Sequence, residues 1–224
     1  MSSEGISARE VAMQIEPGAV LEGELVLPQG ATALVLFAHG SGSSRHSPRN
    51  RFVAGELQMG GLGTLLFDLL TAEEEQIDRG TRHLRFDIGL LARRLAGATR
   101  WTLAQSELEG LRLGYFGAST GAAAALIAAA EHPRDVAAVV SRGGRPDLAG
   151  PALPRVTQPT LLIVGSRDFQ VITLNEEALA QMNQRESRLE IVPGASHLFE
   201  EPGTLEQAAA LARDWFVRYL AGPS

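Results

Sequence analysis

Short, almost uninterrupted apolar runs alternate with helix-like segments along most of this chain, and no other feature restricts its fold as strongly. Continuous apolar runs are typical of strands that are buried on both faces, as in a parallel sheet. The apolar runs are residues 33–38, 62–67, 111–116, 136–140 and 160–164, with a weaker one at 189–192. The helix-like segments are residues 48–59, 82–95, 119–131, 174–182 and 204–220. We therefore predict an α/β fold in which helices flank a mostly parallel sheet.

The N-terminal part of the chain has a different pattern. Residues 20–27 alternate roughly between apolar and polar side chains, as in a half-buried strand, and a Pro-Gln-Gly turn ends the segment. We expect residues 11–15 to pair with it and to add an antiparallel pair at one edge of the sheet. No stretch has the composition of an interdomain linker, so we expect residues 1–224 to form one domain. Residues 140–160 are too few for a large lid domain, and the acidic segment 73–75 is interpreted as a solvated connection.

Composition excludes several kinds of site and argues against some partners. The chain contains no cysteine, so disulfides, zinc–thiolate sites and a cysteine nucleophile are excluded. The net charge of −6 argues against a nucleic-acid partner, because phosphate binding needs a basic face. The apolar run 122–130 is shorter than the roughly 20 residues of a membrane-spanning helix, so no membrane partner is expected. The first residues have no signal-peptide pattern, and we expect a cytoplasmic protein.

A serine lies between two glycines where the apolar run 111–116 gives way to the alanine-rich helix 119–131. The stretch GASTG at residues 117–121 has the pattern G-x-S-x-G, with Ser119 at its centre. In a nucleophile elbow, a sharp strand-to-helix turn holds the serine in a strained conformation, and its neighbours must be small. The same serine could instead be an ordinary helix N-cap. The setting between a strand and a helix favours the nucleophile.

A serine hydroxyl needs a general base, which a histidine can supply. The chain has five histidines: His39, His46, His83, His132 and His197. His197 lies between the last predicted strand and the last predicted helix, where α/β sheets place functional groups. His83 lies in a helix-like segment and His132 at a helix end, so we interpret both as surface or capping residues.

Asp168 supplies the orienting carboxylate in this interpretation. It lies just past the apolar run 160–164, where an aspartate can also be a turn or N-cap residue. Ser119, Asp168 and His197 each follow a predicted strand, and their order along the chain is the order of an α/β-hydrolase. We predict that these three residues form a catalytic triad.

A glycine-rich loop, HGSGSS at residues 39–44, follows the first core strand. Its backbone N–H groups can form an oxyanion hole together with the N–H of Thr120, the residue after the nucleophile. We predict Ser41 as the loop donor, with Gly42 as the alternative, and we expect His39 to brace the loop. A phosphate-binding loop is excluded because no G-K-[S/T] follows the glycines. The histidines have no partner set with metal-ligand spacing, so no metal site is predicted.

These motifs, together with GSRDFQV at residues 165–171 and GASH at residues 194–197, make the sequence resemble the α/β-hydrolase superfamily and, within it, the dienelactone hydrolase-like group. The resemblance covers nearly the whole chain in element order. It implies an eight-stranded, mostly parallel sheet and no cofactor. The name-giving dienelactone hydrolases use cysteine as the nucleophile, whereas this chain has Ser119. Their lactone chemistry is therefore not carried over directly.

Arginines gather in the loops that follow predicted strands, and they bear on the choice of substrate. These residues are Arg45, Arg49, Arg142 and Arg145. Guanidinium groups at a pocket favour a carboxylate or another anion. The alternative is that the arginines only form ion pairs at the rim, with Asp147, Glu200 or Glu201.

Taken together, the sequence predicts a serine hydrolase that cleaves a small carboxylic ester or lactone through an acyl-enzyme, with an anionic ester as one option. A thioesterase or acyltransferase with the same triad is the alternative among enzymes. If the protein is not an enzyme, the alternative is a non-catalytic binding protein with the same fold. A nucleotide-binding sheet is disfavoured, because no G-x-G-x-x-G follows an early strand. The sequence leaves homo-oligomerisation open.

Overall fold

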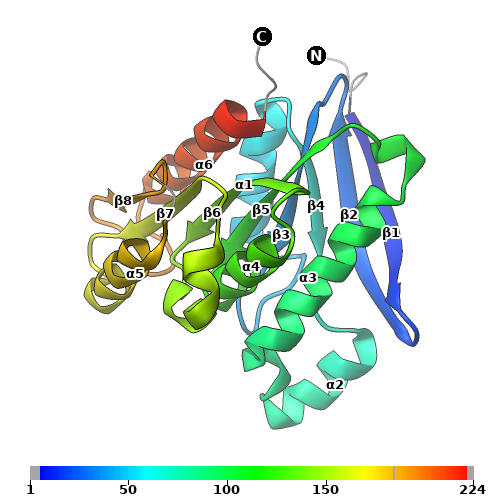
Figure 1. Cartoon of the computed structure of the whole chain (residues 1–224), viewed down its shortest axis with the longest axis horizontal. Coiled ribbons are helices and arrows are strands. Elements are labelled where there is room, and N and C mark those ends of the chain that lie inside the picture. Colours follow the sequence, from blue (N-terminus) through cyan, green and yellow to red (C-terminus); the bar gives the residue numbers. More distant parts are fainter. Residues whose placement is uncertain (1–5, 184, 221–224) are drawn as a thin grey trace.

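The computed structural model describes residues 6–183 and 185–220 of the chain. Within these ranges eight strands form one sheet in the order β1-β2-β4-β3-β5-β6-β7-β8 (Figure 1). The strands are β1 (Ile6–Glu16), β2 (Ala19–Pro28), β3 (Ala33–Ala38), β4 (Gly63–Phe67), β5 (Arg112–Ala118), β6 (Val136–Arg142), β7 (Thr160–Gly165) and β8 (Arg188–Val192). The predicted α/β-hydrolase architecture is confirmed.

The direction of the strands determines where the loops meet. β1 pairs antiparallel with β2, and β2 pairs antiparallel with β4. All other neighbouring strands of the described sheet are parallel. Strands β3, β4 and β7 are buried along their whole length, whereas most side chains of the edge strand β1 are exposed. Because parallel strands end at the same edge, the loops after β3, β5, β6, β7 and β8 meet at the carboxyl edge of the sheet.

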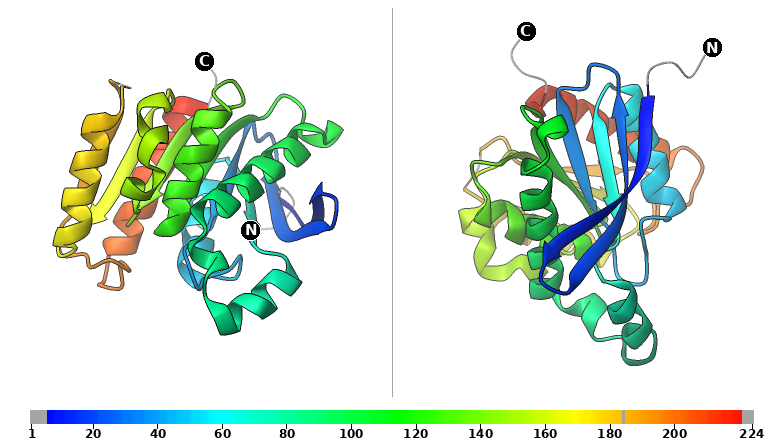
Figure 2. Two further views of the ribbon diagram at one scale, coloured as in Figure 1. Left: turned by 60° about the horizontal axis from the view of Figure 1, so that its bottom comes forward. Right: turned by 90° about the vertical axis from the view of Figure 1, so that its right-hand side faces the viewer.

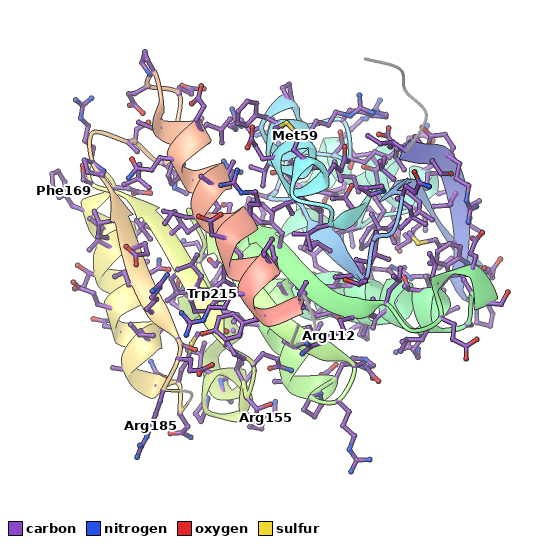
Figure 3. The ribbon with its side chains drawn as sticks, turned by 90° about the horizontal axis from the view of Figure 1, so that it is seen from above. Met59, Arg112, Arg155, Phe169, Arg185 and Trp215 are labelled. Atoms are coloured by element: carbon purple, nitrogen blue, oxygen red, sulfur yellow. The ribbon has the colours of Figure 1, made fainter. Side chains whose placement is uncertain are left out.

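Helices cover both faces of the sheet (Figure 2). The helices are α1 (Pro48–Met59), α2 (Ala72–Thr81), α3 (Ile88–Leu103), α4 (Thr120–Glu131), α5 (Phe169–Gln181) and α6 (Thr204–Leu220). Helices α1 and α6 bury one apolar cluster against the sheet, and Trp215 of α6 belongs to it (Figure 3). Helices α3, α4 and α5 bury a second cluster on the opposite face. Helix α2 lies at the end of the molecule away from the two termini (Figure 1).

Little covers the carboxyl edge in the part of the chain that the structure describes. The connection from β6 to β7 contains only a 3₁₀ stretch, Pro146–Arg155, so no large lid is present there. Within the described ranges, no helix combines the length and the apolar character that crossing a membrane requires.

We predicted that the acidic segment at residues 73–75 is a solvated connection, and this prediction is wrong. The segment forms the first turn of α2. The Thr71 hydroxyl accepts a hydrogen bond from the Glu74 N–H at 3.2 Å, and the Glu74 carboxylate accepts one from the Thr71 N–H at 2.9 Å. This reciprocal pair is a capping box, and the neighbouring carboxylates interact favourably with the positive end of the helix. Only Asp78 of α2 is buried, so the helix has no apolar stripe that would have marked it in the sequence.

The helix predicted for residues 82–95 begins later than expected. Arg82 has a φ of +55° and ends α2, and Asp87 accepts a hydrogen bond from the Leu90 N–H at 2.9 Å as the N-cap of α3. His83 therefore lies in the connection and not in the helix. Buried Asp78 closes this connection, because its carboxylate accepts a hydrogen bond from the Leu84 N–H at 2.7 Å.

Candidate active site

Ser119 lies at a strained turn between β5 and α4. Its φ is +50° and its ψ is −122°, a conformation that costs energy for a residue with a side chain. Although it occupies the N-cap position of α4, its hydroxyl makes no capping hydrogen bond. The interpretation of Ser119 as an ordinary N-cap is therefore wrong, and the hydroxyl is free for another role.

Steric contacts explain why glycine occupies both ends of the G-x-S-x-G stretch. A Cβ at Gly121 would lie 2.1 Å from the carbonyl oxygen of Ala38, because the first turn of α4 abuts the end of β3. A Cβ at Gly117 would lie 2.4 Å from the Cα of Ala122. Neither position can hold a larger residue without moving backbone. The turn that presents Ser119 therefore depends on both glycines.

Asp168 and His197 are in direct contact. Asp168 follows β7 at the N-cap position of α5, but its carboxylate does not cap the helix. It accepts instead a hydrogen bond from His197 Nδ1 at 2.6 Å, with the Asp168 side chain 15% exposed and the His197 side chain 39% exposed. An Nδ1–H that donates to the carboxylate leaves Nε2 as the nitrogen that can take up a proton.

The loop that carries His197 is tied to the end of β7. The Arg167 N–H donates to the carbonyl oxygen of Ala195 at 2.9 Å, and a Cβ at Gly165 would lie 2.4 Å from the same oxygen. The Ser196 N–H donates to the Glu201 carboxylate at 2.9 Å. These contacts hold the imidazole beside Asp168. Phe169, the next residue, is 76% exposed and projects from the edge of the molecule (Figure 3).

The loop after β6 touches both Ser119 and His197. The Ser119 N–H donates to the Arg142 carbonyl oxygen at 3.4 Å. A Cβ at the next residue, Gly143, would lie 3.6 Å from ring atoms of His197. Among the residues that the structure describes, no hydrogen bond joins the Ser119 hydroxyl to the His197 ring. The structure thus brings Asp168 and His197 into contact and puts Ser119 near them, while the catalytic role of all three stays a prediction.

The predicted oxyanion loop packs directly on the serine. A Cβ at Gly40 would lie 3.0 Å from Ser119 Cβ. The Ser43 N–H donates to the Gly40 carbonyl oxygen at 3.1 Å and closes a turn. The Ser41 N–H, our predicted oxyanion donor, is engaged, because it donates to Thr120 Oγ1 at 2.9 Å.

Gly42, which we predicted as the alternative loop donor, has a free amide. Its φ of +71° turns the backbone at the centre of the loop. Within the described residues its N–H makes no hydrogen bond. The N–H of Thr120 begins α4, where the first N–H groups of a helix have no intrahelical partner.

His39 braces the loop as a neutral imidazole. Its Nδ1–H donates to the Gly40 carbonyl oxygen at 3.0 Å, and its Nε2 accepts a hydrogen bond from the Leu69 N–H at 3.1 Å. Burial lowers the pKa of His39 below its usual value, and it outweighs the neighbouring hydrogen bond and the nearby carboxylates. The ring links the loop after β3 to the loop after β4, so its role is structural, as predicted.

Three of the four arginines singled out in the sequence are paired with carboxylates. Arg145 forms a bidentate ion pair with Asp147, with both N–O distances at 2.8 Å. Arg45 forms an ion pair with Asp68 and a second with Glu22 at 2.9 Å. The pair of Arg145 with Asp147 and that of Arg49 with Glu200 match the alternative of rim ion pairs, and Arg45 is paired with carboxylates that we did not predict.

Arg142 differs from the other three, because it is buried without a carboxylate partner in the described part of the chain. The residue is 7% exposed, and burial together with the charge of Arg49 lowers its pKa to about 10. Its Nη2 donates to Asn50 Oδ1 at 3.3 Å, its Nε has no partner, and its guanidinium lies 5.7 Å from the centre of the Phe199 ring. Arg49 is half-exposed and pairs with Glu200 at 3.6 Å.

A cavity of about 810 Å³ opens beside the oxyanion loop. It lies between β2, this loop and the beginnings of α1 and α2, and Ser41, Gly42 and Arg49 line it. Neither Ser119 nor His197 lines the cavity, so it adjoins the site on the side of the oxyanion loop.

Sequence reasoning missed three residues around the site: Asn50, Arg85 and Phe199. Asn50 and Phe199 surround the guanidinium of Arg142. Arg85 is held by buried Asp78, and its Nη1 lies 3.4 Å from the position that a Cβ of Gly42 would occupy. Each comes from a different segment, so no local pattern marked them.

Comparisons with known proteins agree with this geometry. The sequence profile described as "Dienelactone hydrolase family" matches residues 65–220. A crystal structure of a dienelactone hydrolase from Anabaena variabilis is 60% identical, with a TM-score of 0.95 over 97% of this chain and 100% of that one. The esterase PF2001 of Pyrococcus furiosus shares the fold at 17% identity, with a TM-score of 0.76 over 96% of this chain and 92% of that one.

Curated relatives are similar over almost the whole chain. A Mycobacterium tuberculosis protein that carries the provisional name phosphoribosyl transferase is 56% identical over 216 residues. The match covers 96% of this chain and 48% of that protein. The chain therefore spans about half the length of the curated relatives it matches.

The close approach at Gly121 predicts a large effect of one methyl group. Gly121→Ala should lower the free energy of unfolding by about 3 kcal/mol or more, because the Cβ would overlap backbone atoms of β3. Gly80→Ala is the matched control, because no atom lies within 4 Å of a Cβ there, and it should gain about 0.5–1 kcal/mol as a helical alanine. Urea denaturation measures both values. Equal stability of the two variants would contradict the steric account of the elbow.

The buried, neutral His39 predicts a dependence of stability on pH. The pKa of His39 is lowered in the folded protein and is about 6.5 in the unfolded chain, so only the unfolded state takes up the proton just below pH 6.5. The contribution of His39 is complete above pH 6.5 and falls with pH by up to about 1.4 kcal/mol per unit. His39→Gln should remove this part of the slope in urea denaturation between pH 7 and pH 5. An unchanged slope in His39→Gln would contradict the role of His39.

Proposed function

The chain belongs to the dienelactone hydrolase family, and we propose that it is a serine hydrolase that cleaves small carboxylic esters or lactones through an acyl-enzyme. One observation carries the proposal. Ser119 and Asp168 both stand at the start of a helix, and neither caps it. The serine is held in a strained turn with a free hydroxyl, and the aspartate binds the imidazole of His197 instead. Backbone strain of this kind is concentrated at active sites.

The proposed reaction has two halves. Ser119 Oγ bonds to the carbonyl carbon of the ester, the π electrons move to the carbonyl oxygen, and His197 Nε2 takes the hydroxyl proton. The tetrahedral intermediate collapses, and the proton passes from His197 to the leaving alcohol. Water then attacks the acyl-enzyme in the same way and frees Ser119. Asp168 orients the imidazole and stabilises its protonated form.

Backbone N–H groups stabilise the oxyanion in this proposal. Thr120 contributes one N–H, at the positive end of α4. The loop contributes the N–H of Ser41 or of Gly42, and the engagement of the Ser41 amide favours Gly42. In other hydrolases the loss of one such donor costs about 3 kcal/mol of transition-state stabilisation.

Other activities are less well supported. A thioesterase or acyltransferase would use the same triad, and a substrate panel separates them from an esterase. The provisional transferase name belongs to a protein about twice as long as the matched segment, and we do not carry that activity over. With a net charge of −6 we propose no nucleic-acid partner, and a cytoplasmic location, the absence of a membrane partner and the absence of a cofactor stay predictions from the sequence.

We further propose that the substrate carries a negative charge. A buried guanidinium without a carboxylate is costly, and a bound anion would offset that cost. Arg142 is in this state at the end of β6. Its backbone carbonyl oxygen accepts the hydrogen bond of the Ser119 N–H, so the residue lies beside the proposed nucleophile. The roles first predicted for Arg45, Arg49 and Arg145 are less well supported, because all three are paired.

The triad is tested by substitution. Ser119→Ala and His197→Ala should each abolish hydrolysis of p-nitrophenyl acetate, because the residues act as one unit, and Asp168→Asn should cost less than either. Circular dichroism checks that the variants fold. A fluorophosphonate probe should label the wild-type protein and not Ser119→Ala. A folded Ser119→Ala protein with wild-type turnover would contradict the proposal.

The charge of the substrate is tested with a succinate half-ester and a matched neutral ester. Wild type should prefer the half-ester about tenfold to a hundredfold in kcat/KM, the value of one desolvated Arg–carboxylate contact of roughly 1.5–3 kcal/mol. Arg142→Met keeps the packing of the side chain and should lose the preference without slowing the neutral ester. Arg112→Ala, at the opposite end of β5 (Figure 3), should keep it. Equal kcat/KM values on both esters in wild type would remove the case for an anionic substrate.

A further inference from the structure

A hydrogen bond joins the oxyanion loop to the residue after the nucleophile. The Ser41 N–H donates to Thr120 Oγ1 at 2.9 Å, across 79 positions of the sequence. Thr120 is 5% exposed and stands between Ser119 and Gly121. Its side chain is therefore fixed inside the site, in contact with the loop that packs on Ser119.

The proton of the Thr120 hydroxyl makes no hydrogen bond within the described residues. A threonine hydroxyl has one proton and two lone pairs, and the Ser41 N–H uses a lone pair. Among the described residues no acceptor receives the proton. A buried hydroxyl proton that no described residue accepts is available to an acceptor on a bound substrate.

We propose that the Thr120 hydroxyl donates a hydrogen bond to the oxyanion, and that the Ser41 N–H acts through this hydroxyl and does not contact the oxyanion itself. The inference rests on the proposed function, because the oxyanion forms only if Ser119 attacks a carbonyl. Thr120 is then a catalytic residue in addition to the triad. It contributes its backbone N–H and its side chain to the same oxygen.

The step moves no proton on Thr120. As the bond from Ser119 Oγ to the carbonyl carbon forms, the π electrons of the carbonyl become a lone pair on its oxygen, and the serine proton goes to His197 Nε2. The Thr120 O–H remains intact and donates to this oxygen. The Ser41 N–H holds a lone pair of the hydroxyl, which polarises the O–H and strengthens its donation. Through this chain of two hydrogen bonds, the Ser41 N–H also helps to stabilise the negative charge of the oxyanion.

Substitutions at position 120 separate this role from a structural one. Thr120→Val keeps the branched shape and removes the hydroxyl, and Thr120→Ser keeps the hydroxyl. Thr120→Val should lower kcat for p-nitrophenyl acetate about 100-fold with little change in KM, since a lost oxyanion donor costs about 10²–10³ in kcat. The affinity for a trifluoromethyl ketone, whose hemiketal oxygen is an oxyanion, should fall by a similar factor. Thr120→Ser should stay within about fivefold of wild type in both measurements, because it retains the donor.

Thr102→Val is the matched control, because Thr102 is also a buried helical threonine and its hydroxyl bonds the Ala98 carbonyl far from the site. It should leave kcat and inhibitor affinity unchanged. Thr120→Ala serves as a second variant without the hydroxyl, in case Thr120→Val does not fold.

Two results would overturn the role of Thr120. An unchanged or higher kcat in both variants without the hydroxyl would mean that Thr120 only accepts the hydrogen bond of the Ser41 amide. A lower kcat with full affinity for the ketone would mean that the hydroxyl only positions the loop. A different result would contradict the proposed function itself: wild type would neither hydrolyse esters nor react with the fluorophosphonate probe. The role of Thr120 would then be contradicted as well.

Discussion

The close contact between the first turn of α4 and the end of β3 is the constraint on which the site depends. The carbonyl oxygens of Ala38 and His39 fill the space where a side chain at Gly121 would lie. Beside this contact the chain passes from β5 into α4 through a turn in which Ser119 takes a positive φ. The same contact puts the glycine-rich loop after β3 against the serine. The strained serine and the neighbouring loop therefore lie on either side of one packing contact.

The N-cap positions show which polar residues stabilise the fold and which are left for another role. Ser47, Thr71 and Asp87 accept hydrogen bonds from the first turns of α1, α2 and α3, where a cap contributes about 1 kcal/mol. Ser119 and Asp168 stand at the equivalent positions of α4 and α5 and make no such bond. The two helices thus forgo that stabilisation. The first N–H groups of α4 stay available for a developing negative charge.

The charged residues around the carboxyl edge also fall into those that are paired within the fold and those that are left for another role. Arg45 and Arg145 are neutralised by nearby carboxylates, and the neutral ring of His39 only braces the loop. Arg142 is the exception among the arginines of these loops, because its guanidinium is buried beside an amide and an aromatic ring. The site therefore combines a free hydroxyl, a bound imidazole and an unneutralised positive charge, close to one edge of the sheet.

The sequence by itself determined the alternation of strands and helices, the glycine pattern around Ser119 and the order of the polar residues along the chain, because each of these depends on neighbours a few positions away. It did not reveal α2, whose stability comes from a capping box and not from an apolar face. Only the tertiary structure decided that His197 meets Asp168, that Thr120 meets the loop after β3, and that Arg142 meets no carboxylate among the described residues. The physical reason is that these contacts depend on which strands lie side by side in the sheet. A local pattern places a side chain at the end of a strand but does not specify its partner across the sheet.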